Sequence, residues 1–239
     1  MKKTLIAMGI LLFSVNCFAD NSSTSAIPKT SQSETPATTQ APIEEGKQYI
    51  VLPTYPSPEK EVIEFFSFNC PSCFRFESKF HGTNLIAKAL PENMKVKRYH
   101  LLDFGSLAME LSEAWAIANV LGIEDKASQA LYDAVQKDRT IKTADDIKAV
   151  FAKLGVDAET YEKTKNSFLV KAFMVQQADA IKEMKPSSIP SIIVNRKFYI
   201  NSSGLDASND AAYIADYVRV ATFLSNLDSN VNVDSKKKK

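Results

Sequence analysis

The sequence predicts an α/β protein in which a sheet domain is interrupted by an all-helical insertion. Runs rich in aromatic and β-branched residues occur near 48–102 and again at 191–200, as expected of strands. Between them, over about 105–185, apolar residues recur at helical spacing instead. The 239 residues, 45% of them hydrophobic, suffice for one sizeable core. The net charge of +1 gives no reason to expect nucleic acid as a partner.

The first 19 residues have the pattern of a secretory signal peptide. Lys2 and Lys3 precede an apolar segment too short to span a bilayer with ease, and small residues follow at the cleavage position. A bacterial lipoprotein signal, with Cys17 lipidated, is an alternative interpretation. With either signal, we expect the mature chain to face an oxidising compartment, where disulfides persist.

Both ends of the mature chain are expected to be disordered. Residues 20–45 are dominated by Ser, Thr, Pro, Gln and Ala, and such a composition buries too little apolar surface to fold. We therefore predict a tether over 20–45, and a tail over 229–239 that ends in four lysines.

The sheet begins in the first third of the chain. A short strand is predicted at 48–52, followed by a proline-broken loop. The apolar run at 61–68 is typical of a buried strand, and a helix is expected over 74–90. A third strand at 94–102 would lie parallel to the second, because a helix crosses over between them.

Five helices are expected in the insertion, and several of their ends carry recognisable signals. Gly122 and Gly155 are typical helix stops, and Thr143 with Asp146 forms a start resembling a capping box. The expected ranges are 107–121, 124–135, 143–154, 157–164 and 167–184.

Strand patterns return after the insertion. They are predicted at 191–194 and 197–200, with a turn at Asn195 and Arg196 between them. A last helix is expected after Ser208, with apolar residues on one face.

Cys70-Pro71-Ser72-Cys73 lies where strand 61–68 ends and helix 74–90 begins. A sulfur at that position faces the unpaired N–H groups and the positive dipole end of the helix. A thiolate is stabilised there, so the pKa of Cys70 should be lowered and its sulfur should be a good leaving group. Pro71 suits the first helical turn, because its missing N–H removes no helical hydrogen bond.

Two other roles for this cysteine pair are less consistent with the sequence. A zinc site needs further ligands, and Cys17, His81 and His100 form no second close pair. A purely structural disulfide that closes so short a loop would constrain the unfolded chain only weakly. The sequence therefore favours a redox-active pair, and it predicts no metal and no bound cofactor.

The residues around the motif resemble a known family. Glu64 to Phe68 directly precede the cysteines, and other matching stretches follow in order. They are 46–49, 99–100, 115–116, 144–147, 189–190 and 204–206. Together they resemble the DsbA family of the thioredoxin superfamily from about Gly46 to Leu227. The resemblance implies a thioredoxin-like sheet domain, 46–104 and 186–228, with an inserted all-helical domain, 105–185.

The resemblance also implies roles for the two cysteines and for a proline distant in sequence. Cys70, exposed at the helix start, would take the attack of a substrate on a Cys70–Cys73 disulfide, and the shielded Cys73 would be the leaving thiol. Pro190 would be cis, which leaves the backbone of Ile189 free to pair with an extended substrate. Ser72, Ile189 and Pro190 are therefore the expected substrate-binding residues.

Glu64 is the third expected catalytic residue. A carboxylate within an apolar strand is costly unless it is paired or protonated. By resemblance, Glu64 would lie beneath the disulfide and help to move the proton of Cys73. Arg98 is the expected partner, although a one-residue slip would bring Lys97 to its place. A solvent-facing Glu64 at a strand edge is the alternative.

Ser72 departs from the pattern, because well-known family members have His at this place. Histidine can carry a positive charge beside the Cys70 thiolate, whereas serine offers only a hydrogen bond. The hypothesis is that Cys70 is less acidic here and the protein a milder oxidant, so Ser72→His should raise the reduction potential. His81 and His100 also occupy family-like positions, and both are interpreted as structural.

The function implied by the resemblance is that of a periplasmic dithiol oxidase. The protein would be a monomer that gives its disulfide to unfolded exported proteins and is recharged by a DsbB-like membrane quinone reductase. Two alternatives stay open at this point: a disulfide reductase or isomerase, and a thiol-holding chaperone for few clients.

Overall fold

The computed structural model describes residues 41–230. The predicted signal peptide, Cys17, most of the predicted tether and most of the predicted tail lie outside the described residues. Residues 41–45, placed in the tether by sequence, already contact the folded part. Ile43 packs against buried core residues, and Arg219 Nη1 donates a hydrogen bond to the Ala41 carbonyl, 2.9 Å away. The folded region therefore begins earlier than residue 46.

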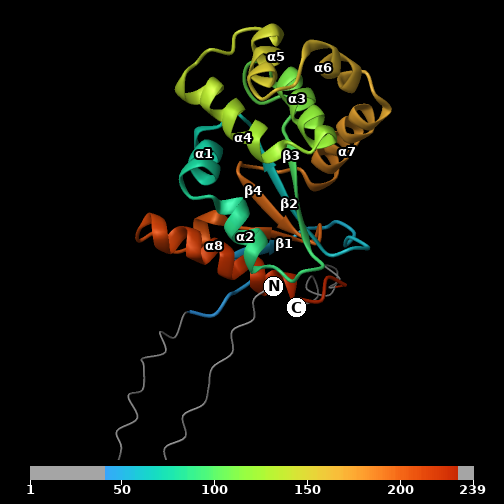
Figure 1. Ribbon diagram of the computed structural model, residues 1–239. Helices are drawn as coiled ribbons and strands as arrows, with labels where there is room; N and C mark the ends of the chain where they lie inside the picture. The colour runs from blue at the N-terminus through green and yellow to red at the C-terminus, as the bar shows by residue number, and fades with distance from the viewer. Residues whose placement is uncertain (1–40, 231–239) are drawn as a thin grey trace, which may run out of the picture. The chain divides into compact units, whose positions relative to one another are not determined.

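Five strands form one mixed sheet in the order β1-β5-β4-β2-β3 (Figure 1). The strands are β1 (Tyr49–Val51), β2 (Glu61–Phe66), β3 (Lys95–His100), β4 (Ser191–Val194) and β5 (Phe198–Ile200). The α-helices are α1 (Pro71–Phe74), α2 (Gly82–Ala89), α3 (Ala108–Leu121), α4 (Glu124–Tyr132), α5 (Ala144–Lys153), α6 (Ala158–Lys165), α7 (Phe168–Met184) and α8 (Asp210–Ser225). Three short turns of other helix types are η1 (Arg75–Lys79), η2 (Asp133–Lys137) and η3 (Ser202–Gly204).

Strand β2 leads directly to the cysteine motif, and all six of its residues are buried. It pairs with β3 in parallel, as the crossover predicted, and with β4 antiparallel. Helices α2 and α8 lie together on one side of the strands, and α3 to α7 form a group on the other (Figure 1). Apolar side chains of β2 therefore contribute to separate clusters, such as Val62 toward α8 and Phe65 toward α7.

The single helix predicted over 74–90 is wrong. The chain runs from α1 into the wider turn η1 and then breaks before α2, where His81 has a left-handed φ of 52°. Packing explains the break. The backbone at Gly82 approaches the Phe76 ring so closely that a Cβ there would lie 2.4 Å from it. Only glycine, which has no Cβ, allows this approach.

The helix signals in the insertion are confirmed. Gly122 caps α3 in the left-handed conformation, and Thr143 and Asp146 form a full capping box at the start of α5. The hairpin between β4 and β5 turns at Asn195 and Arg196, both with positive φ (52° and 57°). The Lys197 N–H closes this turn on the Val194 carbonyl at 3.0 Å, and Val194 pairs with Phe198.

Candidate active site

Cys70 is the N-cap of α1, as predicted, and Cys73 lies one turn further in. The backbone N–H of Cys73 donates a hydrogen bond to Cys70 Sγ, 3.3 Å away, and both cysteines are free thiols in this structure. The expectation that Cys70 is exposed is wrong, because its side chain is only 5% exposed and that of Cys73 is 0% exposed. The segment containing Ile189 covers Cys70, whose Sγ lies 3.6 Å from the Ile189 carbonyl oxygen.

The two thiols differ strongly in acidity. The hydrogen bond from the Cys73 thiol is the largest effect and lowers the pKa of Cys70 to about 7 against the effect of burial. The backbone N–H groups of Cys73 and Ser72 lower it further. Burial raises the pKa of Cys73, and its hydrogen bond to Cys70 and the charge on Cys70 raise it further. Near neutral pH, Cys70 is therefore about half ionised, and any negative charge of the reduced pair lies on it, while Cys73 holds its proton.

The Ile189–Pro190 peptide bond is cis, as expected. Because the Ile189 carbonyl oxygen lies 3.6 Å from Cys70 Sγ, this segment is brought to the cysteines across 119 residues of sequence. Next to it lies a groove with a volume of about 350 Å³. Its lining includes Ser72, Phe76, Phe80, Pro190, Asp210 and Tyr213. The groove is large enough for a short stretch of peptide, and two of the three predicted substrate-binding residues border it.

Glu64 is buried within β2 at 0% exposure. Arg98 Nε donates to Glu64 Oε2 at 2.6 Å, and Thr83 Oγ1 donates to the same oxygen at 2.8 Å. The pairing with Arg98 is therefore confirmed, and the solvent-facing alternative is wrong. Lys97 projects from the other side of β3 and pairs with Glu61 at 2.7 Å.

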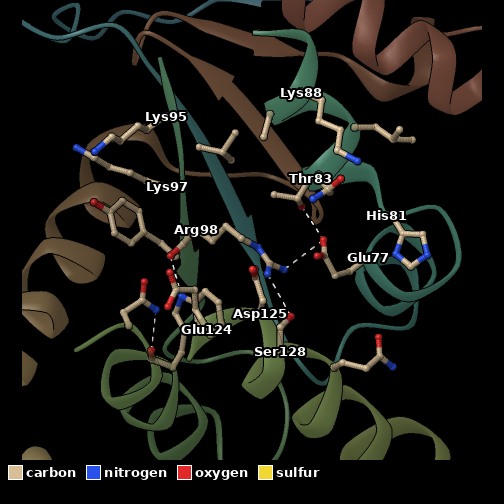
Figure 2. Close-up of a pocket in the computed structure, with 18 of the residues that line it drawn as sticks. Glu77, His81, Thr83, Lys88, Lys95, Lys97, Arg98, Glu124, Asp125 and Ser128 are labelled. Carbon is tan, nitrogen blue, oxygen red and sulfur yellow. Dashed lines mark hydrogen bonds and ion pairs between the residues drawn. The ribbon is translucent and has the colours of Figure 1, made fainter. Parts of the chain in front are cut away.

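The charged cluster around Glu64 extends further, to residues of α4 and η1. Arg98 Nη1 donates to Ser128 of α4 at 3.1 Å, and Arg98 Nη2 lies 3.5 Å from Glu77 of η1. Figure 2 shows Arg98 reaching from β3 between these two residues, with Thr83 directed toward Glu77. The cluster borders an open cavity of about 1060 Å³, so its outer members reach solvent.

The charges in this cluster act on one another and on Cys73. Burial raises the pKa of Glu64, Arg98 opposes that rise, and Glu77 adds to it. Burial opposes the charge on Arg98, yet its two carboxylate neighbours raise the pKa of the guanidinium. The negative charge on Glu64 in turn adds to the rise in the pKa of Cys73. This arrangement can hold or accept a proton close to the buried thiol.

Sequence reasoning missed Glu77, Thr83 and Ser128 as parts of the site. Glu77 follows Cys73 by four residues, and this helical spacing could have placed it beneath the motif. Thr83 and Ser128 carry no comparable signal, because one follows an unpredicted chain break and the other comes from the insertion.

The two histidines have structural positions. Burial lowers the pKa of His100 to about 3, so its ring is neutral and Nε2 accepts a hydrogen bond from the Phe68 N–H at 2.9 Å. His81 is exposed at the break before α2. Ser72 is exposed at the groove, and the hypothesis that it makes the protein a milder oxidant stays a prediction.

A pair of cysteines at a helix start, beside a cis-proline and at the end of a buried interior strand, defines a thiol–disulfide protein of the thioredoxin fold. The sequence profile of the DSBA-like thioredoxin domain matches residues 61–212. The chain belongs to this family.

Curated relatives agree with the family assignment. The thiol:disulfide interchange protein DsbA of Pectobacterium carotovorum is 42% identical over 184 residues, which cover 77% of this chain and 89% of the relative. The DsbA of Yersinia pestis is 40% identical over 186 residues, covering 78% and 90%. The protein is therefore an enzyme, a protein-disulfide oxidoreductase that acts as a dithiol oxidase.

Solved structures show the same architecture, a thioredoxin-like sheet with an inserted set of helices. DsbA from Klebsiella pneumoniae has a TM-score of 0.74 at 34% identity, covering 78% of this chain and 100% of that one. A cysteine-to-serine variant of Proteus mirabilis DsbA, described with a non-covalently bound peptide PWATCDS, has a TM-score of 0.74 at 35% identity. It covers 77% of this chain and 99% of the Proteus chain.

Proposed function

We propose that Cys70 and Cys73 are the redox pair through which this enzyme oxidises the thiols of newly exported proteins. Hydrogen bonds from Cys73 to Cys70 Sγ carry the proposal, because the Cys73 thiol and, to a smaller extent, the Cys73 N–H at 3.3 Å stabilise a Cys70 thiolate. A stabilised thiolate favours the reduced pair, and a disulfide whose reduced form is favoured is a strong electron acceptor.

The proposed reaction has two exchange steps. A substrate thiolate attacks Cys70 Sγ, the bond to Cys73 breaks, and its electron pair stays on Cys73 Sγ. A second substrate thiolate then attacks the substrate sulfur of the mixed disulfide, and Cys70 leaves as a thiolate. The substrate loses two electrons and gains a disulfide, and the enzyme becomes a dithiol. Glu64, with its raised pKa, would take up or return the proton of Cys73.

The substrate would bind along Ser72, Ile189 and Pro190. The position of the Ile189 carbonyl beside Cys70 and the adjoining groove support an extended peptide there. The peptide-bound Proteus relative supports the same idea, since its peptide contains a cysteine. The periplasm, reached through a signal peptide over 1–19, is the proposed compartment, and a DsbB-like membrane quinone reductase is the proposed oxidant of the reduced enzyme.

Parallel assays of Cys70→Ser and Cys73→Ser test the proposal. With a reduced dithiol peptide as substrate, both variants should lose oxidation activity. When the reduced variants are mixed instead with the disulfide form of the peptide, the Cys70 thiolate of Cys73→Ser should attack that disulfide and form a mixed disulfide, whereas Cys70→Ser should not. Full activity of Cys70→Ser would overturn the assignment. Faster reduction of insulin than oxidation of the peptide by the unaltered protein would favour the reductase alternative.

A further inference from the structure

Tyr132, the last residue of α4, is completely buried beside the cysteine helix. Its ring centroid lies 4.8 Å from that of Phe68 and 5.7 Å from that of Phe74. Phe68 precedes Cys70 by two residues, and Phe74 directly follows Cys73. The phenol is therefore held between the two chain segments that flank the redox pair.

The hydroxyl of Tyr132 has no hydrogen-bond partner among the described residues, although it is shielded from solvent. Buried hydroxyl groups are nearly always paired, so an unpaired one calls for a physical reason. In the part of the chain that the structure describes, the neighbouring charged cluster also holds two buried atoms without a hydrogen bond, Glu64 Oε1 and Arg98 Nη2, the latter 3.5 Å from its ion-pair partner Glu77. Phe66 lies between the charged cluster and Tyr132. The centroid of its ring is 4.5 Å from the Arg98 guanidinium carbon and 6.2 Å from the centroid of the Tyr132 ring.

The surroundings keep this phenol protonated. Burial raises the pKa of Tyr132 well above its ordinary value, and negative charge on Cys73 raises it further. Arg98 acts in the opposite direction, whereas Glu64 and Glu77 add to the rise. The hydroxyl therefore remains a donor when charge develops on the Cys73 sulfur.

We propose that Tyr132 donates a hydrogen bond to the Cys73 sulfur at the moment the disulfide opens. The inference deepens the proposed function and rests on it. As the substrate thiolate bonds to Cys70, the S–S bond breaks and its electron pair becomes the Cys73 thiolate. The Tyr132 O–H then hydrogen-bonds to this anion and keeps its proton. The Tyr132 hydroxyl would stabilise the developing negative charge on the Cys73 sulfur. Fixed hydrogen-bond donors stabilise a developing oxyanion in the same way, in a site that excludes water.

The expected effect follows from the strength of a hydrogen bond to a charged group. Removing such a donor should slow the opening of the disulfide about tenfold or more. The equilibrium potential should change much less, because the finished reduced pair carries its charge on Cys70 and its proton on Cys73.

Tyr132→Phe is the direct test, because it removes the hydroxyl and keeps the ring. Tyr161→Phe is the matched control, since Tyr161 is a buried tyrosine of the same insertion that packs against Phe151 at 5.1 Å. The oxidised proteins are mixed rapidly with a reduced dithiol peptide, and the second-order rate constant is measured. We expect a loss of about tenfold or more for Tyr132→Phe and less than about twofold for the control.

A denaturant titration of the oxidised proteins separates this role from a structural one. If the Tyr132 hydroxyl stabilised the fold, its removal would lower the free energy of unfolding. Because the hydroxyl is unpaired, we expect its removal to leave the free energy of unfolding unchanged or to raise it. A Tyr132→Phe rate within twofold of the original, or a loss of stability that accompanies the loss of rate, overturns the inference. If Cys70→Ser abolishes oxidation while Tyr132→Phe does not slow it, the inference alone fails. If Cys70→Ser stays active, the proposed function fails with it.

Discussion

A carboxylate inside a fully buried strand is stable only when its surroundings compensate its charge. Glu64 meets this condition through Arg98 and Thr83, which both donate to its Oε2 atom. The compensation is incomplete, because Oε1 has no hydrogen-bond partner among residues 41–230. The pKa of Glu64 is therefore raised by burial, and the group keeps a capacity to bind a proton near Cys73.

Arg98→Ala should lower the free energy of unfolding at pH 7 by about 3–5 kcal/mol, because it leaves the Glu64 charge buried without its partner. A raised carboxyl pKa means that the folded state binds the proton more tightly than the unfolded state. The loss should therefore shrink as the pH falls through the pKa of Glu64. Urea unfolding at several pH values measures both effects.

Lys97→Ala is the control for this substitution, on the same strand. Lys97 is 48% exposed, and its partner Glu61 keeps a second cation, Arg196, at 3.0 Å. The expected loss is below about 1 kcal/mol. Equal losses in the two variants would contradict the importance assigned to the Glu64–Arg98 pair.

At the scale of the elements, the break between η1 and α2 shapes both the groove and the charged cluster. It lets Phe80 line the groove and brings Thr83 of α2 to Glu64. Gly82 makes the break possible by its close approach to the Phe76 ring. A continuous helix over 74–90 would have placed these side chains differently, since every residue after the break would be rotated.

Gly82→Ala should lower the free energy of unfolding by about 1–3 kcal/mol, because the added methyl group would overlap the buried Phe76 ring. In a Phe76→Leu background, the cost of the same substitution should fall, since the crowding is relieved. Gly122→Ala is the comparison, because nothing lies within 4 Å of its Cβ position and its cost comes from a φ of +66°. Its cost should be the same in both backgrounds. Denaturant unfolding of the variants provides the test.

For the whole molecule, the insertion and the sheet are joined by hydrogen bonds close to the redox pair. Gln136 Nε2 donates to the Phe68 carbonyl at 2.7 Å, and Trp115 Nε1 donates to the Arg98 carbonyl at 2.8 Å. The division into a thioredoxin-like part, 46–104 and 186–228, and an insertion, 105–185, remains our proposal. These bonds imply that the insertion supports the site as well as covering it.

The redox state should change the stability of the whole chain in a pH-dependent way. The pKa of Cys70 falls from an ordinary 9.0 to about 7 in the folded reduced protein. Because the thiol is more acidic in the folded protein than in the unfolded chain, it stabilises the fold at pH values above its unfolded pKa. This contribution to the free energy of unfolding is lost as the pH falls through about 7. Cys73, whose pKa is raised, stays protonated over this range.

We therefore expect the stability of the reduced form, relative to the oxidised form, to increase between about pH 6 and pH 8.5. Urea unfolding of both forms across this range measures the difference. A difference that does not vary with pH would contradict a stabilised Cys70 thiolate. The Cys70→Ser variant, kept reduced, is the control and should lack this dependence.

Features that depend on near neighbours along the chain could be predicted from the sequence. The cysteine motif between an apolar strand and a helix placed Cys70 at an N-cap, and the signals at Gly122 and Thr143 placed helix ends. The buried strand also made a pairing partner for Glu64 necessary. The sequence left Arg98 and Lys97 as candidates, and the strand register brought Arg98 to Glu64.

The depth at which the site is buried, and the side chains that complete it, could not be predicted from the sequence and depend on the tertiary structure. Ile189 covers Cys70 from 119 residues away, and Tyr132 and Ser128 arrive from the insertion. The break at Gly82 depends on contact with a ring six residues earlier. Local patterns specify hydrogen bonds within a few residues, whereas burial and crowding depend on segments that meet only when the chain has folded.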